Sequence, residues 1–134
     1  HDFENDPVTN LTSADIFYVC GGNTFKLLKF ARQCNFQDYV ETLLRNDGVY
    51  IGVSAGSIIL APSVQIVLEI NPDVNDVNIT DFTGFNIIDF LVFPHYEPKY
   101  EEEIRRFETK NNVLVRRITN EQAILLKDNH KELI

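Results

Sequence analysis

Apolar residues follow two different spacings along the first half of the chain. Ala14–Cys20 and Val49–Val53 are short, nearly continuous apolar runs that end at small residues, and they predict buried strands. Between them, a helical apolar face runs from Phe25 to Ala31, before Gln33, and apolar residues recur at offsets of three and four from about Phe36 to Arg45, which predicts two amphipathic helices. We therefore expect a strand, two helices and a second strand in this half.

The second half of the chain is less regular. The region from Ser63 to Gly84 is rich in turn-forming residues and predicts a loop with short strands. The remaining pattern predicts a short helix, a buried strand, a charged helix and two further strands, in order at residues 57–60, 87–93, 99–109, 113–119 and 122–127. Asn120 and Glu121 would join the last two strands into an antiparallel hairpin.

Alternating strands and helices predict a single α/β domain over residues 1–134, with a mainly parallel sheet flanked by helices and a small antiparallel hairpin near its C-terminal end. In such sheets the functional site lies at the carboxyl ends of the strands. We expect three strand exits to converge there, at Cys20-Gly21-Gly22, Val53-Ser54-Ala55 and Phe93-Pro94-His95.

Composition narrows the classes of partner. Hydrophobic residues make up 44% of the 134 positions and charged residues 24%, as in ordinary globular proteins. The net charge of −8, without a basic cluster, disfavours nucleic acid and anionic membrane surfaces. Two cysteines are too few for a disulfide framework, and no apolar run approaches the roughly 20 residues of a membrane span. We expect a cytoplasmic protein.

Gly52-Val53-Ser54-Ala55-Gly56 matches the G-x-S-x-G pattern between a strand and a helix, the context of a nucleophile elbow. Ser54 would then be a nucleophile, and the amide of Ala55 could donate to an oxyanion. The alternative is an ordinary tight turn with a capping serine.

The turn Gly21-Gly22-Asn23 follows the first predicted strand and could serve the same site. The backbone of this turn could place an N–H group against the same oxyanion, and glycine would allow a close approach of the substrate, which Gly21 and Asn23 would contact. The alternative is a helix N-cap with a flexible turn.

His95 stands just after a predicted buried strand and a proline, so its imidazole could act as the base that a serine nucleophile needs. A carboxylate would orient this histidine. Periodicity leaves five candidates open: Glu69, Asp73, Asp76, Asp81 and Asp89.

Three segments, Gly21–Leu28, Gly52–Ser63 and Phe93–Pro98, carry a family resemblance. In this order and spacing the sequence resembles the aspartyl dipeptidase (dipeptidase E) family of serine peptidases, which is related to cyanophycinase. The resemblance implies a class I glutaminase-like, flavodoxin-like fold. It also implies a dipeptidase-type hydrolase that acts on short peptides through an acyl-enzyme, without a cofactor or metal.

Residue by residue, the resemblance implies a triad of Ser54, Glu69 and His95, with Gly22 and Ala55 as the oxyanion amides. The alternatives are a cyanophycinase-like hydrolase and a catalytically inactive member that binds a ligand or partner. Aspartyl-specific members carry an arginine after the histidine, and residues 97–103 contain none. The family's domain also begins with further strand and helix units. We therefore expect an incomplete domain, with those units in a missing N-terminal segment, or a homo-oligomer.

Overall fold

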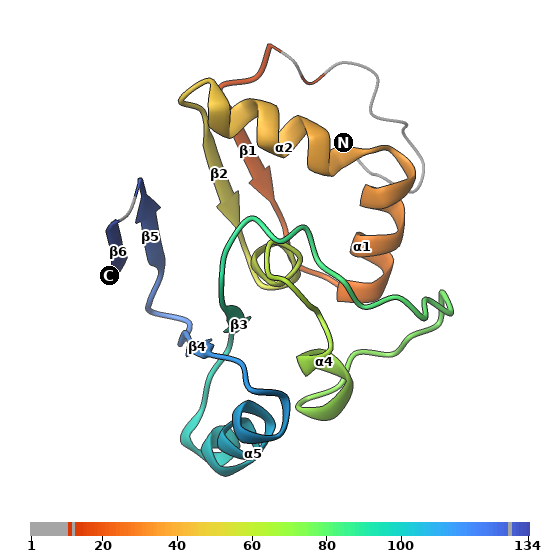
Figure 1. Ribbon diagram of the computed structural model, residues 1–134, viewed down its shortest axis with the longest axis vertical. Helices are drawn as coiled ribbons and strands as arrows, with labels where there is room; N and C mark the ends of the chain where they lie inside the picture. Colours follow the sequence, from red (N-terminus) through yellow and green to blue (C-terminus); the bar gives the residue numbers. More distant parts are fainter. Residues whose placement is uncertain (1–10, 12, 129) are drawn as a thin grey trace.

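The computed structural model describes residues 11, 13–128 and 130–134. Its first half holds two parallel strands and two helices in the predicted order: β1 (Ile16–Val19), α1 (Thr24–Gln33), α2 (Phe36–Arg45) and β2 (Val49–Gly52). The later elements are α3 (Ala55–Ile58), α4 (Ile66–Glu69), β3 (Leu91–Phe93), η1 (Pro98–Tyr100), α5 (Glu101–Asn111), β4 (Val115–Arg117), β5 (Ile124–Lys127) and β6 (His130–Leu133). An α/β architecture is thus confirmed (Figure 1).

Strands β1 and β2 pair in parallel, with Ile16 opposite Val49. α1 begins at its N-cap Asn23, whose side-chain oxygen accepts from the amide of Lys26. Figure 1 shows α2 lying across one face of this strand pair, and Phe17 is buried on the covered side. The strand–helix–helix–strand order predicted from apolar spacing is therefore confirmed.

The second parallel pair is β3 with β4, and it corrects the predicted hairpin. Residues 113–119 were expected to pair with 122–127, but Leu91 donates its amide to the carbonyl of Leu114 at 2.8 Å, and Val115 is buried. The apolar side chains of this segment are thus buried against the core. The antiparallel hairpin forms one strand later, between β5 and β6, where Asp128 directly after β5 has a φ of 51°.

The strands do not form one continuous sheet within the described residues. β1–β2, β3–β4 and β5–β6 are separate two-stranded sheets. The two parallel pairs agree with a mainly parallel arrangement, while the flavodoxin-like class stays a prediction.

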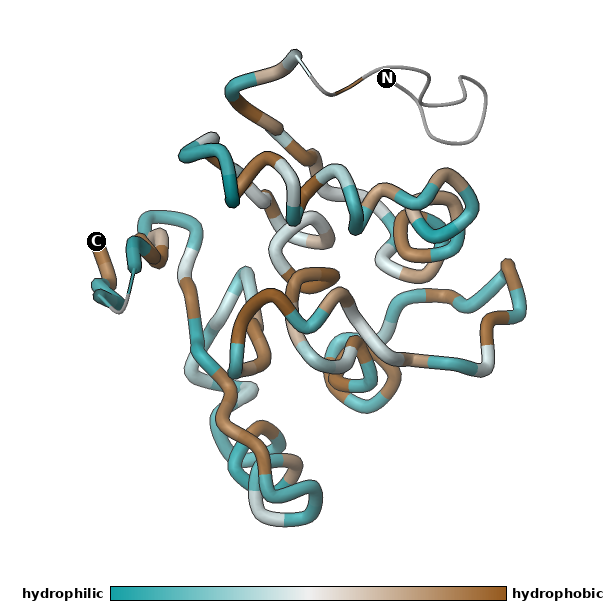
Figure 2. The backbone as a smooth tube through the Cα atoms, turned by 45° about the horizontal axis from the view of Figure 1, so that its top comes forward, coloured by the Kyte–Doolittle hydropathy of each residue, from teal (hydrophilic) through white to brown (hydrophobic). Residues whose placement is uncertain are grey.

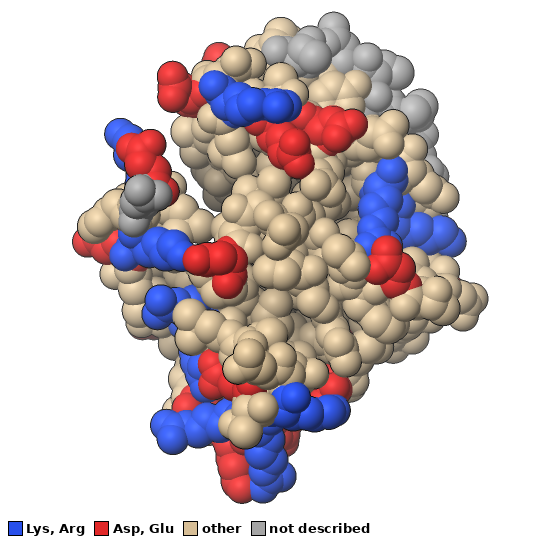
Figure 3. All heavy atoms as spheres, viewed as in Figure 1, with Lys and Arg blue, Asp and Glu red and all other residues tan. Residues whose placement is uncertain are grey.

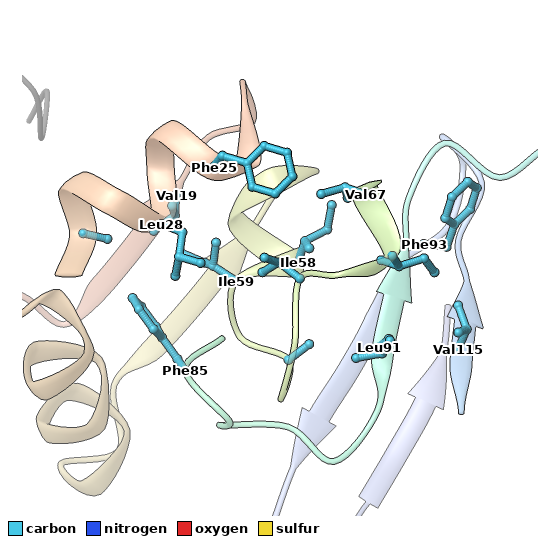
Figure 4. Close-up of a cluster of buried hydrophobic side chains, with 14 of the residues drawn as sticks. Val19, Phe25, Leu28, Ile58, Ile59, Val67, Phe85, Leu91, Phe93 and Val115 are labelled. Atoms are coloured by element: carbon cyan, nitrogen blue, oxygen red, sulfur yellow. The ribbon is translucent and has the colours of Figure 1, made fainter. Parts of the chain in front are cut away.

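A single hydrophobic core joins the two parallel pairs (Figure 4). α1 contributes Phe25 and Leu28, and the segment after β2 contributes Ile58 and Ile59, all at most 4% exposed. Phe93 of β3 is also buried there. The elements that carry the three predicted strand exits are therefore held by one packed cluster.

The loop after α4 is fastened along α1. The amide of Thr24 donates to a carboxylate oxygen of Asp73 at 2.7 Å, and Lys26 pairs with Asp76 at 2.9 Å. Further along, Arg32 donates to the carbonyl of Asp81 at 3.0 Å. This long loop, predicted as turn-rich, is therefore anchored at three points along the helix.

Surface helices show the expected amphipathic pattern. Figure 2 shows alternating hydrophobic and hydrophilic positions along α5, whose Ile104 and Phe107 are buried.

On the face seen in Figure 3, positive and negative side chains intermingle at the periphery, and no patch of one sign dominates. Among the described residues, no helix combines the length and hydrophobicity needed to cross a bilayer.

Candidate active site

Ser54 stands in the sharp turn between β2 and α3. Its φ of 50° and ψ of −115° are unusual for a residue with a side chain and mark a strained turn. A Cβ atom on Gly52 would lie 2.6 Å from the carbonyl oxygen of Gly56, and one on Gly56 would lie 2.3 Å from that of Val19. Both glycines are therefore required sterically, as the elbow pattern predicts.

Two hydroxyl groups brace this turn. The phenol of Tyr50 donates to the carbonyl of Gly56 at 2.8 Å, and the hydroxyl of Ser57 donates to the carbonyl of Ser54 at 2.6 Å. Burial raises the pKa of Tyr50, so its hydroxyl stays protonated and available as a donor. The serine backbone is thus held from both sides.

His95 follows β3 and faces Ser54. Its Nε2 atom lies 2.9 Å from the Oγ of Ser54, across 41 positions of sequence. The exit from β3 is fixed where Tyr96 donates its amide to the carbonyl of Ile118 at 2.9 Å. The structure therefore brings together the serine and the histidine that the sequence analysis selected.

The second ring nitrogen of His95 contacts Asn120, to which the sequence analysis gave only a turn. Nδ1 lies 2.6 Å from the amide oxygen Oδ1 of Asn120. Because an amide oxygen only accepts hydrogen bonds, Nδ1 carries the proton and Nε2 faces the serine as an acceptor. Asn120 lies three residues after the end of β4. The rule that sites gather at carboxyl ends of parallel strands was the signal that could have found it.

The predicted contact between Glu69 and His95 is wrong. The Glu69 carboxylate lies 3.1 and 3.2 Å from the Nζ of Lys110, beside the C-terminal end of α5. The physical reason is that Glu69 ends the short helix α4, where the cation of Lys110 meets its carboxylate.

The other four candidate carboxylates are also engaged elsewhere. Asp73 accepts from the amide of Thr24, and the remaining three pair with cations: Asp76 with Lys26, Asp81 with Arg32 and Asp89 with Lys131. Lys131 lowers the pKa of Asp89 through their hydrogen bond. Within the described part of the chain, no carboxylate contacts the ring of His95.

The glycine turn after β1 lies directly beside the serine. A Cβ atom on Gly21 would stand 2.9 Å from the Cβ of Ser54, whereas one on Gly22 would meet nothing within 4 Å. The backbone amides of Gly22 and Ala55 donate to no acceptor among the described residues. These two N–H groups therefore remain available to an oxygen of a bound molecule.

The side chain of Asn23 makes hydrogen bonds within the protein. Its side-chain oxygen caps α1 through the amide of Lys26 at 2.9 Å, and its amide group donates to the carbonyl of Val74 at 2.7 Å. Both ends of the side chain are thus engaged within the protein, as in the helix-cap alternative.

The site is open to solvent. Ser54 is half-buried, whereas His95 and Asn120 are exposed. No group of three metal-ligating side chains is found in the part of the chain that the structure describes. The arrangement presents a hydroxyl with an adjacent imidazole base and two nearby N–H donors. These are the groups that nucleophilic attack on a carbonyl requires.

Comparison with known proteins gives relatives over nearly the whole chain. An uncharacterized peptidase of Listeria monocytogenes is 30% identical over 129 residues, which cover 94% of this chain and 62% of that protein. An uncharacterized peptidase of Pasteurella multocida is 33% identical over 124 residues, which cover 90% of this chain and 60% of that protein. Peptidase E of Escherichia coli O1:K1 is 33% identical over 94 residues, which cover 68% of this chain and 38% of that protein.

A 1.5 Å crystal structure of a candidate Peptidase E protein from Listeria monocytogenes EGD-e shares the fold, with a TM-score of 0.84 at 26% identity. It matches all of this chain, which corresponds to 68% of that protein. The chain thus spans about 60% of the length of the first curated relatives. The sequence model of peptidase family S51 matches residues 1–134, which confirms the resemblance to the dipeptidase E family, and the chain belongs to peptidase family S51.

Proposed function

We propose that this chain carries the catalytic centre of a serine peptidase that hydrolyses short peptides, with Ser54 as nucleophile and His95 as base. The observation that carries the proposal is the 2.9 Å contact between Nε2 of His95 and Oγ of Ser54. Family membership supports the same chemistry.

In the acylation step, Oγ of Ser54 attacks the carbonyl carbon of the peptide bond while Nε2 of His95 takes the hydroxyl proton. The C–N bond then breaks, and the imidazolium gives that proton to the leaving amine. The acyl group remains on Ser54. Water attacks this ester with the same base, and the serine regains its proton as the acid product leaves.

The tetrahedral intermediate places a negative charge on the former carbonyl oxygen. The free amides of Ala55 and Gly22 are suited to bind this oxygen, because each belongs to a turn adjoining the Ser54 hydroxyl. Gly21 lets the substrate backbone approach the serine closely.

Asn120 takes the orienting role that a carboxylate fills in the more familiar triad. Its oxygen holds the Nδ1 proton of His95, which fixes the tautomer needed for Nε2 to accept a proton. As a neutral group it stabilises the imidazolium less than a carboxylate would. The proposed arrangement is therefore Ser54, His95 and Asn120.

A labelling experiment tests the proposal. A fluorophosphonate probe should label the wild-type chain at Ser54, with no label on Ser54→Ala and at least about a hundredfold slower labelling of His95→Ala. His130→Ala removes a histidine of the hairpin and serves as the matched control that labels normally. Wild-type labelling that does not depend on His95 would refute the base assignment, and labelling of another residue would refute the nucleophile.

A panel of short peptides tests the substrate class. Hydrolysis of dipeptides that is lost in Ser54→Ala would support the proposal. Release of aspartate-arginine units from cyanophycin, with dipeptides untouched, would instead establish the cyanophycinase-like alternative. Binding of peptides without turnover would identify a ligand-binding member of the family.

A further inference from the structure

The glycine turn between β1 and α1 makes few contacts of its own. Gly21 and Gly22 have no side chains, and Gly22 has a φ of 138°, which other residues rarely adopt. Within the described residues, the backbones of these two glycines make no hydrogen bond. A turn of this kind has several accessible conformations. The direction of the Gly22 N–H therefore depends on the segments at the two ends of the turn.

The end of β1 supports the entry to this turn. Val53 donates its amide to the carbonyl of Val19 at 2.9 Å, which joins the last residue of β1 to the residue before Ser54. Gly21 is also in close contact with Ser54, since a Cβ atom on it would stand 2.9 Å from the serine Cβ. These contacts fix where the turn begins, and its exit into α1 needs a second support.

Asp73, in the loop after α4, holds that exit. Its Oδ2 atom accepts from the amide of Thr24, the first residue of α1, at 2.7 Å, and Thr24 is 1% exposed. The first amides of a helix have no partner inside the helix, and a carboxylate is favoured there by the helix dipole. The next loop residue repeats the link, because the carbonyl of Val74 accepts from Nδ2 of Asn23 at 2.7 Å. The two residues that follow Gly22 are thus tied to two consecutive residues of the loop.

The position of Asp73 is itself fixed by the core. Its amide donates to the carbonyl of Val67 in α4 at 3.0 Å, and Val67 is buried. Ile66 and Val67 of α4 belong to the same hydrophobic core as Phe25 of α1. A continuous series of contacts therefore runs from the core through α4 and Asp73 to the exit of the glycine turn.

We propose that Asp73 is a positioning residue for hydrolysis at Ser54, because it holds the exit of the glycine turn so that the Gly22 N–H points at the oxyanion. The inference rests on the proposed function, which gives that amide its role. Asp73 acts as a hydrogen-bond acceptor for Thr24, so an amide oxygen in the same position can replace its carboxylate. Asp73 thus supports the oxyanion side of the site, whereas the sequence analysis considered it only as an acid beside His95.

The test measures the rate of Ser54 labelling by the fluorophosphonate probe, together with kcat and KM for a dipeptide that the wild type hydrolyses. Asp73→Ala should slow labelling and lower kcat about ten- to a hundredfold with KM within about threefold, because a misplaced oxyanion donor weakens binding of the transition state and not of the substrate. Labelling should still run to completion, since the molecules are folded and only react slowly. Asp73→Asn should restore both rates to within about threefold of wild type, because its Oδ1 accepts from the same amide.

A second variant tests the neighbouring link with the helix cap kept. Asn23→Ser retains a good N-cap residue but lacks the amide group that reaches the carbonyl of Val74. It should slow labelling about three- to tenfold, and it keeps the test decisive if Asp73→Ala does not fold. Asp76→Asn is the matched control, since it removes only the exposed ion pair with Lys26 from the same loop and should label at the wild-type rate.

Three results would overturn the proposal. One is a wild-type labelling rate and kcat for Asp73→Ala, and another is an Asp73→Asn variant as slow as Asp73→Ala, since charge would then matter instead of the acceptor. The third is a wild-type rate in a smaller labelled fraction, which would limit Asp73 to a role in folding. In all three cases Ser54→Ala would remain unlabelled, whereas failure of the proposed function would appear as labelling or hydrolysis that does not depend on Ser54.

Discussion

The side-chain oxygen of Asn120 lies 2.6 Å from Nδ1 of His95, although 25 positions separate the two residues. A neutral amide thus stands where a triad would have its carboxylate. The contact fixes the tautomer of the imidazole without adding a negative charge, and it makes Asn120 a positioning residue whose effect can be measured.

Asn120→Leu should lower kcat about ten- to a thousandfold with little change in KM, because the ring loses its orientation while the substrate contacts remain. Asn120→Asp should retain activity, because a carboxylate oxygen can accept the same Nδ1 proton. Steady-state kinetics, with kcat and KM determined separately, check both. If Asn120→Leu kept the wild-type kcat, the contact would be merely structural.

Glu69→Gln should leave turnover within about twofold of wild type, because the carboxylate pairs with Lys110 and not with His95. The surface pair contributes at most about 1 kcal/mol to the free energy of unfolding. Urea unfolding should give a similar small loss for Lys110→Met, and the double variant should lose little more. A drop in kcat of more than tenfold for Glu69→Gln would contradict the structure.

Gly56→Ala should destabilise the chain by about 1–3 kcal/mol and abolish labelling of Ser54. The added methyl group would fall 2.3 Å from the carbonyl oxygen of Val19, so the elbow must shift. Gly22→Ala is the comparison, since its methyl group meets nothing within 4 Å and only the φ of 138° is strained. Thermal unfolding measures the loss of stability, and probe labelling measures the reactivity of Ser54. A Gly56→Ala variant with the stability and labelling of the wild type would refute the steric argument.

Acid stability should depend on Glu101. Hydrogen bonds from Arg105, and then from Arg117, lower the pKa of this carboxyl from 4.5 to about 2. A depressed pKa in the folded state means that the stabilisation is complete above about pH 4.5 and is lost as the pH falls towards 2. Urea midpoints between pH 6 and pH 2.5 should therefore decline less steeply for Glu101→Gln than for wild type.

The matched control for Glu101→Gln is Glu102→Gln. Glu102 pairs with Arg106 on the same helix, with both side chains more than 70% exposed. Its removal should leave the pH dependence of the wild type nearly intact. Equal slopes for wild type and Glu101→Gln would show that the Arg105 and Arg117 contacts do not couple stability to pH.

Local patterns in the sequence predicted the parts of the fold that local chemistry determines. Apolar spacing over Phe25–Ala31 and about Phe36–Arg45 predicted two helices, and the structure has α1 at Thr24–Gln33 and α2 at Phe36–Arg45. Ser54 and His95 could be selected because an elbow pattern and a strand exit are visible within a few residues. Their contact followed from the expectation that parallel strands end at one edge.

The remaining features depend on contacts between distant segments. The partner of β4 was misassigned, since a short apolar run fits either a hairpin or a parallel pair. The partner of His95 was missed because five carboxylates were considered and each is engaged by another group, as Glu69 is by Lys110. No local pattern reveals which carboxylate a lysine or a helix N-terminus will engage.

The distances in sequence within the site bear on the order in which the molecule assembles. Ser54 and His95 are 41 positions apart, and Asn120 lies 25 further on. Each contact requires closure of a long loop, and the chain loses the entropy of closure before the contact contributes any favourable free energy. The helices can form early from local contacts, whereas the hydroxyl, imidazole and amide meet only when both parallel pairs are in register. The contacts among Ser54, His95 and Asn120 therefore form late in folding, and a nascent chain completes them only after the segment that carries Asn120 has been synthesised.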